Sequence, residues 1–132
     1  MSDEQIAVMR DAFAAFARGD EDVLLSRLSD DFEVHDAMVV EDTTGERGPG
    51  AMRRNLDRIA EAFERVSYEP TEFLDLGDRV LVRVAVRARG SSSELDLETE
   101  VGQLWTMADE LATRLDVFPS WAEARRELGL DP

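Results

Sequence analysis

The chain has 132 residues, of which 30 are acidic and 15 basic, so its formal net charge is −15. This length predicts a single domain over residues 1–132, because single cores commonly hold about 100–200 residues. The acidity argues against nucleic acid and anionic membrane surfaces as partners, because polyanions need a Lys/Arg footprint. The sequence has no Cys, which excludes thiol catalysis, disulfides and thiolate metal sites.

No segment approaches the roughly 18 apolar residues that a membrane span needs. The acidic start, Met1 to Glu4, does not resemble a signal peptide. We therefore expect a soluble, cytoplasmic protein.

Helical periodicity dominates the first third of the chain. Residues 4–18 predict a helix that ends at Gly19, and residues 20–22 begin a second, short helix. A short strand is expected over residues 31–37. Strand alternation places Asp36 on one face and His35 on the other. The apolar stripe of the first helix consists of Ile6, Met9, Phe13 and Phe16.

Residues 41–50 contain several Gly, Pro and Thr and predict a long loop, which in a small domain is often a lid or binding loop. Residues 51–65 predict a third helix, and Pro70 is expected to end any continuation of it. Its buried stripe consists of Met52, Leu56, Ile59 and Phe63.

From residue 80 onward, apolar residues recur at every second position, which is the pattern of a strand. Residues 80–87 and 95–105 alternate and predict a hairpin, with Arg residues of one strand opposite acidic residues of the other. A turn at 109–110, a last strand over 113–118 and a terminal helix over 121–128 complete the pattern. The sequence therefore predicts an α+β domain with helices on one face of a curved sheet. The expected cross-strand charges are Arg83, Arg87 and Arg89 opposite Glu94, Asp96 and Glu98.

Several segments, taken in order and spacing, resemble SnoaL-like proteins of the nuclear transport factor 2-like superfamily. Together they cover nearly the whole chain. The matching segments are Phe13–Asp20, Leu28–Asp36, Leu76–Val80, Gln103–Thr106 and Ala124–Leu130.

This resemblance implies a cone-shaped α+β barrel. A strongly bent, mostly antiparallel sheet would wrap around three N-terminal helices and enclose a blind apolar cavity, with a short C-terminal helix. The family includes polyketide cyclases, ketosteroid isomerases, limonene-type epoxide hydrolases, dehydratases and non-catalytic binders, so the fold alone names no reaction.

Asp36 is the first candidate catalytic residue, because it resembles the position of the general base in ketosteroid isomerases. Desolvation at an apolar cavity wall raises the pKa of a carboxylate and makes it a better base near neutral pH. The alternative is a strand-end Asp that accepts backbone N–H bonds from the next loop.

Asp116 is the second candidate. The run Arg114 to Phe118 resembles the stretch that carries one catalytic Asp in limonene-type epoxide hydrolases. Two carboxylates across a small cavity can hold unequal pKa values and divide the acid and base roles. The alternative is a structural ion pair between Arg114 and Asp116.

The chain also departs from the known enzymes. The tyrosine of the first helix in ketosteroid isomerases falls near Ala12, and the partner acid falls near Gly102. Leu81 replaces the Asp of the epoxide hydrolase pattern, and the catalytic Asp of SnoaL cyclases falls near Pro119. The resemblance therefore implies no complete catalytic set.

His35 is the only histidine, and we expect it on the surface or at an interface rather than in the cavity. One His and no Cys cannot build a usual zinc site, so no metal or other cofactor is expected.

We expect the residues that line the ligand site among aromatic, Met and polar side chains. The alternative is that these side chains are ordinary members of the hydrophobic core. These candidates are Phe13, Phe16, Met52, Leu56, Phe63, Gln103, Trp105, Arg114 and Phe118. The leading hypothesis is a small apolar ligand in the cavity, with cofactor-free acid–base catalysis of isomerase, cyclase, dehydratase or epoxide-hydrolase type. The alternative is a non-catalytic binding or assembly module. A homodimer through the sheet face is expected in either case.

Overall fold

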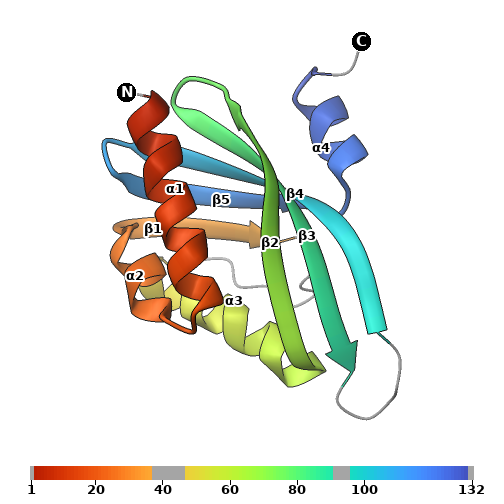
Figure 1. Cartoon of the computed structure of the whole chain (residues 1–132). Coiled ribbons are helices and arrows are strands. Elements are labelled where there is room, and N and C mark those ends of the chain that lie inside the picture. Colours follow the sequence, from red (N-terminus) through yellow and green to blue (C-terminus); the bar gives the residue numbers. More distant parts are fainter. Residues whose placement is uncertain (1, 37–46, 91–95, 131–132) are drawn as a thin grey trace.

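The structure, a computed structural model, describes residues 2–36, 47–90 and 96–130. Within these ranges, four helices and five strands form one α+β arrangement (Figure 1). In chain order they are α1 (Ser2–Ala17), α2 (Glu21–Ser26), β1 (Leu28–Asp36), α3 (Pro49–Ala62), β2 (Phe63–Asp75), β3 (Arg79–Gly90), β4 (Asp96–Ala108), β5 (Leu111–Phe118) and α4 (Trp121–Glu127).

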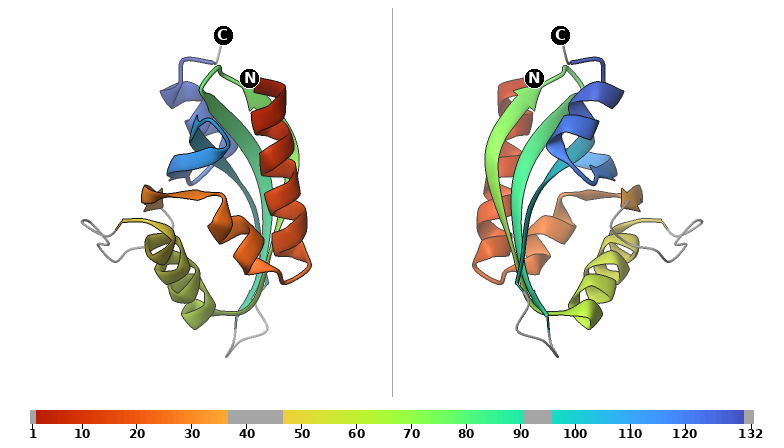
Figure 2. Two further views of the ribbon diagram at one scale, coloured as in Figure 1. Left: turned by 90° about the vertical axis from the view of Figure 1, so that its left-hand side faces the viewer. Right: turned by 90° about the vertical axis from the view of Figure 1, so that its right-hand side faces the viewer.

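The five strands form one bent sheet in the order β1-β5-β4-β3-β2. β1 pairs with β5 in parallel, and the other neighbours are antiparallel. The side views in Figure 2 show the long strands as curved ribbons, with α3 leading directly into β2. The sheet therefore has an inner face, toward α1 and α3, and an outer face.

The main core lies on the inner face. Val80, Val82 and Val84 of β3 are fully buried there, as strand alternation requires. They pack in one cluster with Phe32 of β1 and Met9 of α1. The period-two pattern and the helical stripe thus meet in one apolar interior.

A second, smaller core lies on the outer face, under α4. Trp121 and Ala124 of α4 pack against Leu81 and Leu104, whose neighbours along the strands point inward. Ser120 caps α4 by accepting a hydrogen bond from the Glu123 amide at 3.1 Å. The three N-terminal helices thus lie on the inner face, as expected, and the short C-terminal helix lies on the outer face.

The predicted α+β architecture is confirmed, with one strand missed. β2 begins at Phe63, within the predicted third helix, and continues through residues that the pattern left unassigned, so α3 ends at Ala62 rather than at residue 65. Pro70 was expected to end a continuation of the third helix. It lies instead inside β2, next to an irregularity in the pairing of β2 with β3. An edge strand tolerates proline because its outward N–H needs no partner. The predicted loop over 41–50 falls mostly on residues 37–46, outside the described residues.

Candidate functional site

Two neighbouring chambers, which share four lining residues, lie between the inner face of the sheet and the helices. The larger has a volume of about 140 Å³ and lies between α3 and the strands. The smaller, of about 40 Å³, lies between α1, α2 and β4. Their walls are mostly apolar, which is the usual composition of a small-molecule site.

Asp36 borders the larger chamber at the end of β1. The side chains of Phe32 and Val34, on the same face of the strand, are buried in the core, so alternation turns Asp36 inward. Its Oδ2 accepts a hydrogen bond from Nδ2 of Asn55 at 3.2 Å. Asn55 is only 5% exposed, so α3 holds this carboxylate from a buried position.

Tyr68 extends from β2 into the same region and borders both chambers. Its ring contacts Phe16 edge-on, with centroids 5.7 Å apart. Burial, assisted by the negative charge of Asp36, raises the pKa of the Tyr68 hydroxyl from 10.0 to about 12. The phenol is therefore a hydrogen-bond donor at any physiological pH.

Gln103 and Trp105 lie on the inner face of β4, and both are buried. The indole Nε1–H of Trp105 donates to Oε1 of Gln103 at 3.0 Å. Trp105 is itself held between Phe32, whose ring stacks on it, and the edge of Phe13. The orientation of the Gln103 amide is therefore fixed by a packed neighbour.

Most of the predicted lining residues lie around these chambers. They come from α1, α3, β2 and β4, and the structure brings them together around one cavity. They are Phe13, Phe16, Met52, Leu56, Phe63, Gln103 and Trp105.

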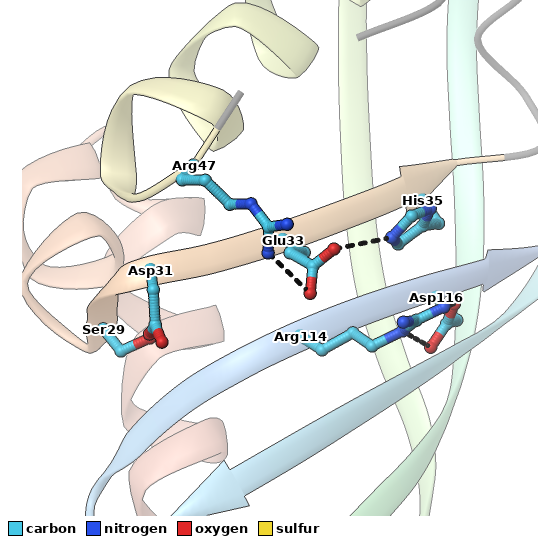
Figure 3. A network of polar contacts seen from close by, with 7 residues as sticks. All are labelled: Ser29, Asp31, Glu33, His35, Arg47, Arg114 and Asp116. Atoms are coloured by element: carbon cyan, nitrogen blue, oxygen red, sulfur yellow. Dashed lines mark hydrogen bonds and ion pairs between the residues drawn. The ribbon is translucent and has the colours of Figure 1, made fainter. Parts of the chain in front are cut away.

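Asp116 does not face this cavity, which corrects the prediction of two carboxylates sharing it. Leu115 and Val117 border the larger chamber, so Asp116 lies on the opposite face of β5. There Arg114 donates two hydrogen bonds to Asp116, at 2.9 and 3.0 Å, which is the alternative that the sequence left open (Figure 3).

Phe118 and His35 also lie on the outer side. Phe118 packs in the second core under α4, so neither it nor Arg114 reaches the chambers. His35 is about half exposed and lies 3.5 Å from Glu33, which also pairs with Arg47 at 2.9 Å (Figure 3). His35 is thus a surface residue, as alternation with Asp36 suggests.

Asn55 and Tyr68 are not among the residues that the sequence pattern singled out. A signal for Asn55 exists, because it is a polar residue on the buried stripe of α3, beside Met52 and Leu56. Tyr68 belongs to the strand that the pattern missed, although it is the only tyrosine in the chain. Ala12, near which the resemblance to ketosteroid isomerases implies a tyrosine, borders the smaller chamber.

Within the described ranges, no group of three or more His, Asp or Glu side chains could hold a metal ion. None of the helices described is long and apolar enough to cross a membrane.

The profile of the SnoaL-like domain family matches residues 9–115. The chain belongs to the SnoaL-like domain family. No curated protein sequence matches it at a significant level.

Solved structures show the same fold. TerC, crystallised with polyporic acid, is 23% identical, with a TM-score of 0.77 and coverage of 95% of this chain and 97% of that one. An NTF2-like protein from Burkholderia xenovorans LB400 is 28% identical, with a TM-score of 0.72 and coverage of 89% and 90%. A protein from Jannaschia sp. CCS1, assigned as a SnoaL-like polyketide cyclase, is 14% identical, with a TM-score of 0.74 and coverage of 99% and 95%. The SnoaL-like chain thus shares a fold with proteins of more than one description.

Proposed function

We propose that this SnoaL-like protein binds a small, largely apolar organic molecule in its two chambers, and that Asp36 acts on it as a general base without a cofactor. The observation that carries the proposal is the placement of Asp36 at an apolar chamber wall, held by Asn55. The co-crystallisation of TerC with polyporic acid supports an organic ligand in this fold.

The chemistry follows from the surroundings of the carboxylate. A carboxylate that has lost part of its hydration is a stronger base toward a bound substrate than one in water. The hydrogen bond from Asn55 fixes the direction of the carboxylate, which a base needs in order to reach one proton. Asp36 would take a proton from a substrate carbon or oxygen and return it at another position, as isomerisation, cyclisation or dehydration requires. Base-assisted epoxide opening also fits.

A suitable test is the exchange of the α-protons of 2-tetralone for deuterium, followed by NMR in D2O. This ketone is small and apolar, and the exchange reports proton abstraction even where the natural substrate is unknown. Asp36→Asn should lower the protein-catalysed rate by about 100-fold or more, the lower range of a general base.

Asp116→Asn is the matched control, because that carboxylate lies on the outer face in an ion pair. It should leave the exchange rate unchanged. Equal rates for wild type and Asp36→Asn would exclude Asp36 as the base, provided that both proteins give the same circular dichroism spectrum.

The alternative function is non-catalytic binding of the ligand, or assembly as a dimer. Two observations favour it: Ala12 supplies no acid–base group in the smaller chamber, and Asp36 is the one carboxylate among the described residues that border the chambers. Saturable binding of 2-tetralone without any catalysed exchange would support the binding module and contradict the enzyme.

We also propose a homodimer through the part of the outer sheet face that α4 leaves uncovered, and a cytoplasmic location. The uncovered face carries matched charges, with Arg83 donating two hydrogen bonds to Glu100 at 2.8 Å each. Fractionation of cells with an antibody against the chain tests the location, and recovery in the membrane or secreted fraction would contradict it.

A further inference from the structure

The two chambers share four lining residues, here called the waist. The waist consists of Met52 and Leu56 from α3, Tyr68 from β2 and Gln103 from β4. Two of the four are apolar and two are polar, whereas the smaller chamber beyond them is lined by Met, Ala, Phe and Leu side chains and by Trp105. Two polar side chains of the cavity, Tyr68 and Gln103, therefore border both chambers.

Gln103 offers hydrogen-bond donors at the waist. Its Oε1 is already used by the indole N–H of Trp105 at 3.0 Å. An amide whose oxygen is fixed in this way must direct its NH2 group elsewhere. Within the described part of the chain, no hydrogen bond from that nitrogen is found, so Gln103 presents donors rather than an acceptor.

Tyr68 offers a second donor. Its hydroxyl has no hydrogen-bond partner among the described residues, and the side chain is half-buried. The hydroxyl stays protonated, because burial raises its pKa to about 12. A ligand acceptor at this point would bind a donor that the described residues leave unused, in an apolar surrounding that strengthens the hydrogen bond.

The carboxylate of Asp36, a hydrogen-bond acceptor, lies outside the waist. Asp36 borders the larger chamber and not the smaller one, so the base lies to one side of the two donors. A ligand that satisfies all three groups has one apolar end in the smaller chamber. It has an acceptor atom at the waist and a second end beside Asp36.

We propose that the ligand spans both chambers and carries a hydrogen-bond acceptor oxygen at mid-length, which the Tyr68 hydroxyl and the Gln103 amide bind together. The ligand class is an elongated, mostly apolar compound with a ketone-type oxygen between two apolar ends. This inference rests on the proposed function in that it uses the same cavity, but it does not require catalysis.

The test compares two probes of nearly the same shape, benzophenone and 1,1-diphenylethylene. They differ in the central group, which is C=O in one and C=CH2 in the other. Binding is measured by NMR titration of the purified full chain. Two hydrogen bonds should make the ketone bind about tenfold more tightly than the olefin.

Three variants then assign the donors. Tyr68→Phe keeps the ring and should reduce the ketone preference to about threefold, with olefin affinity unchanged. Trp105→Phe frees the Gln103 amide to rotate and should reduce the preference by a similar factor. Trp121→Phe is the matched control, because Trp121 lies in the outer core, and it should keep the full preference.

The carbonyl stretching frequency of bound benzophenone provides a readout that a merely structural role would not change. It should be lower in the wild type than in Tyr68→Phe, since each hydrogen bond weakens the C=O bond. Equal affinity of the wild type for the two probes would overturn the inference and leave the proposed apolar cavity intact. Binding of neither probe would overturn both. A ketone preference without catalysed exchange of 2-tetralone would support the inference and contradict only the enzyme.

Discussion

Tyr68 is a half-buried residue whose pKa is raised by folding. It is the only tyrosine, so the ultraviolet absorbance of tyrosinate reports its ionisation alone. Its position between Phe16 and the chambers explains the raised pKa, because an apolar surrounding disfavours the charged phenolate. The same surrounding makes the phenol useful to a ligand, since water competes poorly for its hydrogen bond.

The absorbance titration of Tyr68 should therefore have a midpoint near 12 in the folded protein and near 10 in urea. The folded state holds this proton more tightly than the unfolded state. The contribution of this proton to the free energy of unfolding is thus fully present below pH 10 and is lost as the pH rises toward 12. The free energy of unfolding of Tyr68→Phe, measured in urea, should therefore fall less between pH 10 and pH 12 than that of the wild type. A midpoint near 10 in the folded protein would contradict the burial of the hydroxyl.

At the scale of elements, β4 serves both faces of the sheet. Its inward residues Gln103 and Trp105 form part of the cavity, and its outward residues Gly102 and Leu104 support α4. α4 approaches so closely that a Cβ atom at Gly102 would lie 2.5 Å from the Cβ of Ala124. A side chain at this position therefore has no room unless the helix moves.

Gly102→Ala should destabilise the protein by about 1–3 kcal/mol, the usual cost of overpacking, measured by urea unfolding. Ala124→Gly in the same chain should restore part of the loss, because it removes the clashing methyl group. Gly50→Ala is the control, since that position in α3 has open space around it and alanine favours helix by up to about 1 kcal/mol. A neutral Gly102→Ala would show that α4 is not firmly docked.

At the scale of the whole molecule, the net charge of −15 is unevenly distributed. Residues 1–50 hold 13 acidic and 4 basic residues, whereas the outer face of β3 and β4 is internally paired. Arg87 pairs with Glu98 and Arg89 lies opposite Asp96, as expected, whereas Arg83 pairs with Glu100, which was not among the expected partners. Glu94 lies outside the described residues. The excess negative charge therefore belongs mainly to residues 1–50, and the paired charges of the sheet face oppose self-association less than unpaired like charges would.

Sedimentation should consequently give a mass twice the 14.8 kDa of one chain at high protein concentration. Two chains of this charge repel each other, so raising the ionic strength from about 0.01 M to about 0.15 M should strengthen the dimer by shortening the Debye length from about 30 to about 8 Å. A strict monomer at both ionic strengths would contradict the proposed dimer.

The sequence by itself determined the α+β class, most of the elements and the resemblance to SnoaL-like proteins. These properties depend on local periodicity and on turn residues, which act within a few positions of the chain. The same local rule placed Asp36 and His35 on opposite faces of β1. It failed for β2, because a polar edge strand with Pro70 alternates too weakly to be recognised.

Only the tertiary structure decided which face of β5 turns inward. Phe118 is apolar, yet it lies on the outer face with Asp116, because α4 gives that face a core of its own. Because both faces of the sheet carry an apolar core here, an apolar residue such as Phe118 does not indicate which face of β5 turns inward. The tertiary structure also brought Asp36, Asn55 and Tyr68 to one chamber. Contacts between three separate elements depend on how the chain packs, and no local pattern encodes them.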